Sequence, residues 1–270
     1  MSPAVGFKKQ GLACAIGGVA YFLGFVGFGQ FYLAWVCFLP LLWAISNVTP
    51  RRALGLGALY GGIAMLGGYY WVIHLLREFA HLPLPLAMLG YLLLCAYQGF
   101  SLGVIAFLTR WLAQHARWPA VWALPVALVV VEPWYPFLFP HFFGNSQYRF
   151  LWITQIVELS GMVGLGALLG LINGALYELL NARLERRSLV PIRLVLPLGL
   201  TALALIFGVI RIGQMDARSE AAPKIDVALI QTNLGARDKR ARREEFIRRH
   251  LEMSRQAEAE HPELDLLVWP

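Results

Sequence analysis

The sequence predicts an α-helical polytopic membrane bundle with about seven transmembrane helices, followed by the first βαβ unit of a soluble α/β domain. Hydrophobic residues make up 58% of the 270 positions and charged residues only 14%, whereas soluble domains carry about 25% charged residues. Long apolar stretches fill the chain up to about residue 212, and the last part, 224–270, is rich in charge. We therefore expect lipid to surround the larger part of the chain, up to about residue 212.

Seven apolar stretches are candidates for crossing the bilayer, because a helix needs ~20 apolar residues to span the hydrocarbon. The second and the fifth are short, and the fifth begins at Pro119. We assign 1–212 to a transmembrane helical domain, 213–223 to a linker and 224–270 to the soluble domain. The stretches cover residues 11–29, 31–47, 53–76, 84–112, 119–134, 151–181 and 192–212.

The distribution of charge predicts the orientation of the bundle. Residues 1–223 hold 14 Lys/Arg and 7 Asp/Glu, which accounts for the whole net charge of +7. With the N-terminus inside, the inner segments hold ten basic residues and the outer short loops hold only Arg77 and Arg149, as the positive-inside rule requires. We therefore expect a cytoplasmic N-terminus and a periplasmic tail in the inner membrane of a bacterium. The positive charge fits lipid head groups, and no nucleic-acid partner is expected.

The tail has the pattern of a strand, a helix and a second strand. We predict strands at 225–231 and 263–269, a turn at 232–235, and a helix from about Lys239 to Glu260. Strands joined by a helix pair in parallel. One βαβ unit cannot cover both faces of its own sheet, so we expect it to begin a larger domain. The apolar face of the helix carries Phe246, Ile247, His250, Leu251, Ser254 and Ala257.

The three cysteines, Cys14, Cys37 and Cys95, lie in apolar stretches with no Cys or His at the spacing of metal ligands. We interpret them as small buried apolar side chains. The sequence therefore predicts no disulfide framework, no metal site and no cofactor.

Motifs from both parts of the chain resemble the apolipoprotein N-acyltransferase family. The tail segments 227–233 and 265–270 resemble the opening of a nitrilase-type domain, a carbon-nitrogen hydrolase fold. The membrane part carries similar motifs in the order and spacing of the family. These motifs are Pro40–Ala44, Tyr69–Val72, Glu132, Phe139–Pro140, Gly144–Gln147 and Glu158–Gly164.

The resemblance implies the last step of bacterial lipoprotein maturation. An acyl chain moves from a phospholipid donor to an enzyme cysteine, and then to the N-terminal amine of a diacylglyceryl-modified lipoprotein acceptor. The family uses a Glu–Lys–Cys triad, whose Glu would follow Pro270 and whose Lys and Cys lie farther downstream. We therefore assign no catalytic residue here, and we expect this chain to be inactive alone.

The resemblance also implies substrate-lining or site-adjacent roles for Glu132, Phe139, Pro140, Ser146, Gln147 and Trp269. The alternatives are interfacial solvation for Glu132, an aromatic belt for 134–150 and core packing for Trp269. Two departures concern substrate contacts: His141 stands where the family often has Trp, and Trp134 and Tyr135 stand where a Leu-Arg pair is common.

Three further expectations concern the interior of the bundle. Glu158 is expected to form a structural hydrogen bond inside it, and Glu178 to extend toward the inner interface. Small residues allow helices to approach closely, and the expected contact glycines are Gly161, Gly164, Gly166, Gly170 and Gly174.

Two other functions fit some of these features. The chain could be a non-enzymatic membrane subunit or the remnant of a split enzyme, which would keep the helices without the triad. A transporter is the other alternative, although the helices carry few ionisable groups and no evident inverted repeat.

The predicted orientation can be tested with alkaline phosphatase, which is active only in the periplasm. We expect a fusion after Gln231 to be active and a fusion near Arg186 to be inactive, because the two positions lie on opposite sides of the membrane. The reverse pattern would contradict the orientation.

Overall fold

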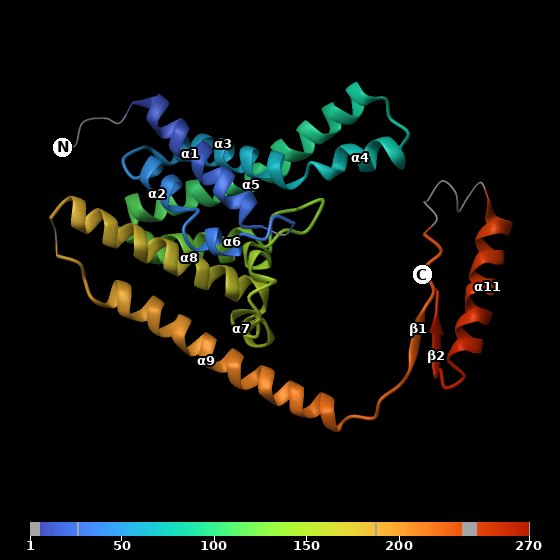
Figure 1. The fold of residues 1–270 in the computed structure, drawn as a ribbon. Helices are drawn as coiled ribbons and strands as arrows, with labels where there is room; N and C mark the ends of the chain where they lie inside the picture. The colour runs from blue at the N-terminus through green and yellow to red at the C-terminus, as the bar shows by residue number, and fades with distance from the viewer. Residues whose placement is uncertain (1–5, 26, 187, 234–241, 270) are drawn as a thin grey trace. The chain divides into compact units, whose positions relative to one another are not determined.

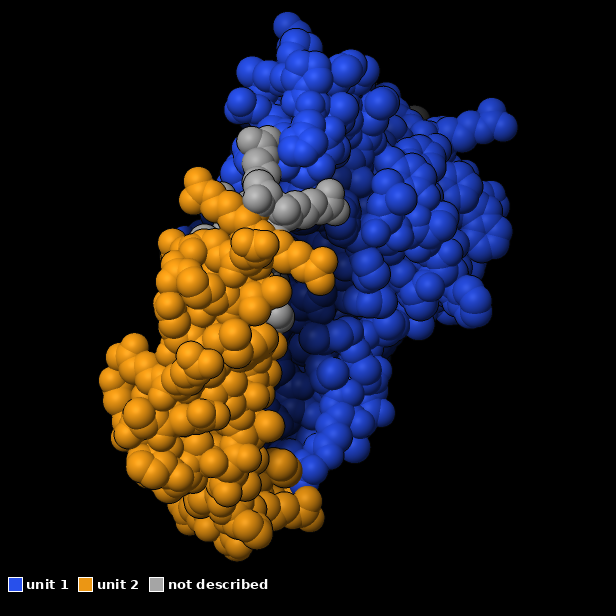
Figure 2. All heavy atoms as spheres, turned by 90° about the vertical axis from the view of Figure 1, so that its right-hand side faces the viewer, with its two compact units in different colours: residues 1–213 blue, residues 214–270 orange. Residues whose placement is uncertain are grey.

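The computed structural model of the protein describes residues 6–25, 27–186, 188–233 and 242–269. The chain divides into two compact units, residues 1–213 and residues 214–270, which Figure 2 colours blue and orange. In its described residues, unit 1 consists of helices and loops, and unit 2 contains the end of a long helix, a further helix and two short strands.

The first half of unit 1 is built from one long helix and several shorter ones (Figure 1). Thr49 begins α3 by accepting a hydrogen bond from the Arg52 amide, with Pro50 at the first helical position, a common start for a helix. The axes of α3 and α4 differ in direction by 60°. These elements are α1 (Phe7–Leu23), η1 (Phe31–Trp35), α2 (Leu39–Ile45), α3 (Pro50–Gly68), α4 (Trp71–Glu78) and α5 (Leu84–His115).

The second half of unit 1 runs through two long helices. Glu178 of α8 accepts a hydrogen bond from the Ala120 amide at the start of α6, at 2.9 Å, and pairs with Arg193 near the start of α9, at 3.1 Å. One carboxylate therefore joins the ends of three helices. The elements are α6 (Ala120–Val131), η2 (Phe143–Gln147), α7 (Leu151–Thr154), α8 (Val157–Leu184) and α9 (Ile192–Ala221).

Three of the described helices, α5, α8 and α9, are long and apolar enough to cross a membrane, and the bent pair α3–α4 makes a fourth if it is one span. The protein is therefore a multi-pass membrane protein. α1 has 17 residues, α6 has 12 and α2 has 7, so they fall below the ~20 residues that a full crossing needs. The expectation of about seven crossings stays a prediction.

Several boundaries differ from those predicted. The stretch 31–47 is divided between η1 and α2, and 53–76 is bent between α3 and α4. Most of the predicted linker, 213–223, is helical, because α9 continues to Ala221. Its residues from 214 to 221 include no Gly or Pro, and Pro223 follows shortly after, so nothing in the sequence stops the helix earlier.

The core of unit 1 lies between α1, α2, α3, α5 and α6. Phe38 and Tyr60 stack at its centre, with ring centroids 5.6 Å apart, and both are 0% exposed. A second, smaller cluster joins α7, α8 and α9 through Ile153, Leu165 and Ala204.

The helices α3 and α5 cross closely, and the crossing is made by glycine. Gly57 and Gly61 of α3 face Gly99 and Gly103 of α5, each pair with a spacing of four residues. A Cβ atom on Gly61 would lie 2.1 Å from the Gly99 carbonyl oxygen. The two backbones therefore touch, which is typical of small-residue packing in membranes, although we did not predict it for these helices.

The glycines predicted on α8 divide into two groups. Gly166, Gly170 and Gly174 pack closely, the last two against α6. The prediction was wrong for Gly161 and Gly164: a Cβ on Gly161 would meet no atom within 4 Å, and one on Gly164 would meet only the neighbouring Ser160 side chain. Gly161 has φ +66° inside α8, so its role is to allow the kink there.

Unit 2 contains two parallel strands, β1 (Val227–Leu229) and β2 (Leu266–Val268), with Ala228 opposite Leu267. The helix α11 (Arg243–Glu260) lies between them in sequence, so the predicted strand–helix–strand order and parallel pairing are confirmed, with shorter strands. The predicted turn at 232–235 and the helix start at Lys239 lie partly or wholly outside the described residues.

The predicted apolar face of α11 is only partly buried. His250 is 0% and Ser254 is 8% exposed, whereas Ile247 and Leu251 are each 41% exposed. These two residues stay exposed because two short strands are too narrow to cover the whole apolar face of a helix, and their predicted position on one face is unaffected.

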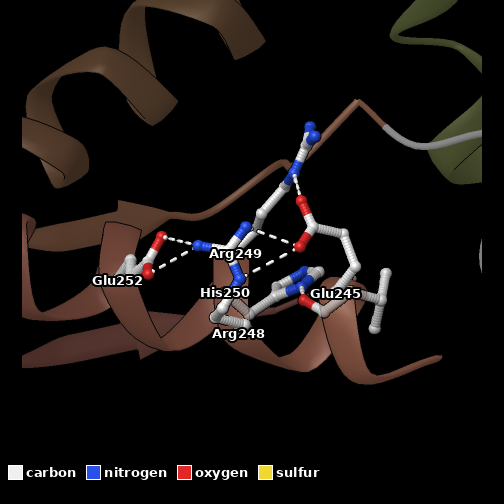
Figure 3. A network of polar contacts seen from close by, with 6 residues as sticks. Glu245, Arg248, Arg249, His250 and Glu252 are labelled. Atoms are coloured by element: carbon white, nitrogen blue, oxygen red, sulfur yellow. Dashed lines mark hydrogen bonds and ion pairs between the residues drawn. The ribbon is translucent and has the colours of Figure 1, made fainter. Parts of the chain in front are cut away.

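The opposite side of α11 is stabilised by ion pairs, which Figure 3 shows. Arg248 contacts Glu245 at 2.5 Å and Glu252 at 2.7 Å, and Arg249 contacts Glu245 at 2.6 Å. Hydrogen bonds from Arg248 and Arg249 hold the pKa of the Glu245 carboxyl below its usual value. The three- and four-residue spacings place these charges on neighbouring turns of the helix.

The glycine crossing of α3 and α5 predicts opposite effects for two adjacent substitutions. Gly61→Ala should destabilise the protein by ~1–3 kcal/mol, because its methyl group would collide with backbone that cannot move alone. Gly62→Ala is the matched control, since a Cβ there meets nothing within 4 Å, and it should be neutral or stabilising. Thermal unfolding in detergent measures both, and equal melting temperatures would contradict the crossing.

Candidate functional site

The loop 132–150, between α6 and α7, carries most of the predicted site residues. Buried polar side chains at the surrounding helices hold the loop in place: Gln98 and Glu132 bond its backbone, and Tyr21 bonds the His141 side chain. Backbone groups outside a helix need partners wherever water is scarce, so these side chains determine the path of the loop. The described part of the chain contains no cluster of three or more His, Cys, Asp or Glu side chains that could hold a metal ion.

Gln98 of α5 binds the loop through its whole side-chain amide. Its Nε2 donates to the Phe139 carbonyl at 2.9 Å and to the Tyr69 hydroxyl at 3.2 Å. Its Oε1 accepts from the Leu138 amide at 3.3 Å. Gln98 is 0% exposed, so neither water nor lipid competes for these bonds, and residues 138–139 are held against α5.

Glu132, at the end of α6, holds the other end of the same turn. Its Oε1 accepts a hydrogen bond from the Phe143 amide at 2.9 Å. Its Oε2 is buried without a partner among the described residues and lies 3.3 Å from where a Cβ on Gly166 would be. The side chain is 3% exposed, which does not fit interfacial solvation. Glu132 therefore anchors the loop at the cost of removing a carboxyl group from water.

A cavity of about 260 Å³ lies where this loop meets α1, α3 and α4. Aromatic rings form much of its wall, including Phe25, Tyr69, Trp71 and Phe139. The Phe139 ring packs edge-on against Trp71 with centroids 5.4 Å apart. Apolar cavities of ~150 Å³ already bind small hydrocarbons, so this cavity has room for part of an acyl chain.

One polar pair lies in the cavity wall. The Tyr21 hydroxyl and His141 Nε2 are 2.7 Å apart, and the two residues are 2% and 5% exposed. The His141 ring also packs on Phe25, with centroids 4.6 Å apart. The pair joins α1 to the loop and gives a largely apolar wall a group that can form hydrogen bonds.

The predicted site residues divide between the cavity and the core. Phe139 and Pro140 line the cavity. Ser146 and Gln147 do not, because they lie in η2 and are 1% and 0% exposed. Gln147 accepts a hydrogen bond from Trp35 Nε1 and donates to the Phe31 carbonyl, both at 3.0 Å, so it holds η1 against η2.

Trp269 belongs to unit 2, where its indole is fixed to α11. Its Nε1 donates to Ser254 Oγ at 2.9 Å, and its ring lies 5.0 Å from that of His250. The residue is 41% exposed. Pro270 lies outside the described residues, and a role of Trp269 beside a catalytic group stays a prediction.

Several residues of the site were not predicted. The contributions of Tyr21 and Gln98 were missed, and His141 was noted only as a departure from the family pattern. Asn173 of α8 was also missed: it accepts from the Phe38 amide at 3.0 Å and donates to the Ala34 carbonyl at 2.9 Å, across the break between η1 and α2. The available signal was a polar amide inside an apolar stretch, which is costly unless it has a structural or functional partner.

The expectation for Glu158 was wrong in its location. Its carboxylate pairs with the Arg211 guanidinium of α9 through two contacts of 2.5 Å, and its side chain is 48% exposed, outside the bundle. The kink at Gly161 separates the first turn of α8, which carries Glu158, from the rest of that helix. The pair is therefore a link between α8 and α9.

Comparison with known proteins agrees with this architecture. The family model described as apolipoprotein N-acyltransferase N-terminal domain matches residues 17–175. This range contains Tyr21, Gln98, Glu132 and the whole loop 132–150, and it covers more than half of the chain. The chain belongs to the apolipoprotein N-acyltransferase family.

Relatives with this name come from several bacteria. The apolipoprotein N-acyltransferase of Geobacter metallireducens is 30% identical over 97% of this chain, and that of Bdellovibrio bacteriovorus is 24% identical over 87%. The one from Nitrosomonas europaea is 30% identical over 58%. The matches cover 51%, 44% and 31% of these relatives, so the chain spans about half of their length or less.

The anchoring role of Glu132 predicts a clear difference between two substitutions. Glu132→Ala leaves the buried Phe143 amide without an acceptor and should cost ~1–3 kcal/mol of stability. Glu132→Gln keeps an acceptor oxygen and removes the buried charge, so it should unfold close to the wild type. Thermal unfolding and limited proteolysis within 133–150, both in detergent, measure the effect. Equal behaviour of the two variants would show that the Phe143 bond does not hold the loop.

Proposed function

We propose that this chain forms the membrane-embedded part of an enzyme that completes bacterial lipoproteins by N-acylation. The observation that carries the proposal is the family match across the bundle, together with an aromatic cavity inside the matched range. In this proposal the bundle holds a lipid substrate, and the loop 132–150 supplies part of the binding wall.

The orientation and the surroundings belong to the same proposal. The N-terminus is cytoplasmic, about seven segments cross the inner membrane, and unit 2 lies in the periplasm. Glu178, Arg193 and the start of α6 meet at one end of the bundle, which is the predicted cytoplasmic end. The cavity is formed near the opposite ends of α1 and α3, where the outer leaflet would supply lipid.

Unit 2 is proposed to be the beginning of a nitrilase-like domain. Its parallel strands on either side of α11 in sequence support this, since such domains are built from repeated βαβ units. The hydrogen bond from Trp269 to Ser254 would then fix the end of β2, after which the family places its catalytic Glu.

The chemistry follows from covalent catalysis. A cysteine thiolate attacks the ester of a phospholipid, the glycerol oxygen leaves, and a thioester forms. The free amine of the diacylglyceryl-cysteine then attacks the thioester, and the thiolate is released. Cys14, Cys37 and Cys95 are at most 1% exposed within the bundle, so none is placed to meet both substrates. This part of the protein binds and orients the lipid.

The proposal predicts the activity of two proteins in vesicles of phosphatidylethanolamine that contain a diacylated lipoprotein. Residues 1–270 alone should not transfer an acyl chain. A chimera that joins them to the half of the Geobacter metallireducens relative beyond the match should transfer it, because it adds the proposed triad to the bundle. Transfer by residues 1–270, or a labelled thioester on one of their cysteines, would contradict the proposal.

Two substitutions in that chimera separate the roles of the two units. Trp269→Ala should lower turnover at least ~10-fold, since a misplaced catalytic group loses rate steeply. Cys95→Ala, a small change in the buried face of α5, should leave turnover within about twofold. A larger loss for Cys95→Ala would move the chemistry into the bundle.

A further inference from the structure

We propose that His141, held by Tyr21, donates a hydrogen bond inside the cavity to the ester carbonyl of a glycerol-linked acyl chain. The inference rests on the proposed function, in which the bundle binds a lipid. The inference specifies which part of the lipid the cavity recognises. It concerns His141, a residue at which this chain departs from the family pattern.

The contact with Tyr21 selects one tautomer of the His141 ring. Tyr21 is 2% exposed, and the hydrogen bond of its hydroxyl in the described structure is the one to His141 Nε2, at 2.7 Å. A buried hydroxyl proton needs an acceptor. Nε2 must therefore accept, and a neutral ring then carries its hydrogen on Nδ1. The other tautomer would leave the Tyr21 proton without a partner.

The Nδ1–H of His141 is then a donor without an acceptor. The described residues form no hydrogen bond with this atom, and it is not among the fully enclosed unpaired atoms, which are Thr109 Oγ1, Glu132 Oε2 and His250 Nε2. The ring lines the cavity, which is the accessible space beside it. Binding of a ligand that supplies an acceptor to a donor in an apolar cavity is favourable, because it removes the cost of the unpaired donor.

The lining of the cavity determines which acceptor fits. Among the described residues, the lining includes no Lys or Arg, so a phosphate group there would be a buried and unpaired charge. Water would meet only the polar groups of Tyr21, Tyr69 and His141 and would make no use of the apolar part of the wall. An ester carbonyl is neutral, accepts one hydrogen bond and continues into an alkyl chain, which matches both the donor and the apolar wall.

Two sources supply this chemistry, a diacyl phospholipid and the diacylglyceryl group of a lipoprotein. Binding to residues 1–270 in detergent can be measured by competition with a fluorescent lipid. The two competitors are phosphatidylethanolamine and a diacylglyceryl-cysteine peptide. Each is used both as the diester and as the diether, which lacks the carbonyl. We expect at least one diester to bind about fivefold more tightly than its diether, as one net hydrogen bond provides.

Four variants test the assignment to His141. His141→Phe should keep lipid binding and lose the ester preference, whereas His141→Asn, which keeps an N–H donor near Nδ1, should retain part of it. Tyr21→Phe should reduce the preference, because the ring is then free to adopt either tautomer. His115→Phe is the matched control: His115 is exposed at the far end of α5, and this variant should keep the full preference.

The outcomes separate the two proposals. Tight binding of lipid with equal affinities for diester and diether would overturn the role of His141 and leave the proposed function intact. An ester preference that persists in His141→Phe would also overturn the role of His141. A wild-type protein that binds neither lipid in any form would count against the proposed function itself. A preference confined to one competitor identifies the phospholipid or the lipoprotein as the source of the carbonyl.

Discussion

The backbone of unit 1 is irregular in several places, and each irregularity must satisfy its polar groups without water. A small number of buried side chains meets this requirement. Gln98 forms hydrogen bonds with the backbone of residues 138–139, and Glu132 with the amide of Phe143. Asn173 forms hydrogen bonds with the backbone on both sides of the break between η1 and α2. The bundle can therefore contain short and broken helices, where a simpler membrane protein would have continuous spans.

The same side chains place the cavity. Gln98 and Glu132 grip the loop at two positions, so that Phe139, Pro140 and His141 between them face α1 and α3. The glycine contact between α3 and α5 brings Gln98 close enough to Tyr69 to share a hydrogen bond. The aromatic wall is thus held in place from the α5 side, where both ends of the Gln98 amide are hydrogen-bonded.

Sequence reasoning predicted the long helices well, since α5, α8 and α9 follow directly from apolar stretches of sufficient length. It also predicted the order and parallel pairing of β1 and β2. It missed the bend between α3 and α4 and the division of 31–47, because hydropathy measures where a chain is apolar and not where its axis changes direction. Phe139 and Pro140 line the cavity and Ser146 and Gln147 lie in the core, and the predicted substrate-lining or site-adjacent roles of all four stay predictions. Tyr21 and Gln98 lie over 70 residues apart and meet the loop only through the fold, and no local pattern reveals such contacts.

The cap that Glu178 provides for α6 has a consequence for how the protein is made. The acceptor of the Ala120 amide, the Glu178 carboxylate, lies 58 residues later in the chain. At ~5–20 residues per second of synthesis, the ribosome needs roughly 3–12 s to deliver it. During that interval α6, with only 12 residues and Pro125 in its interior, has an incomplete first turn. The cap on α6 is therefore completed only after this part of α8 has been synthesised.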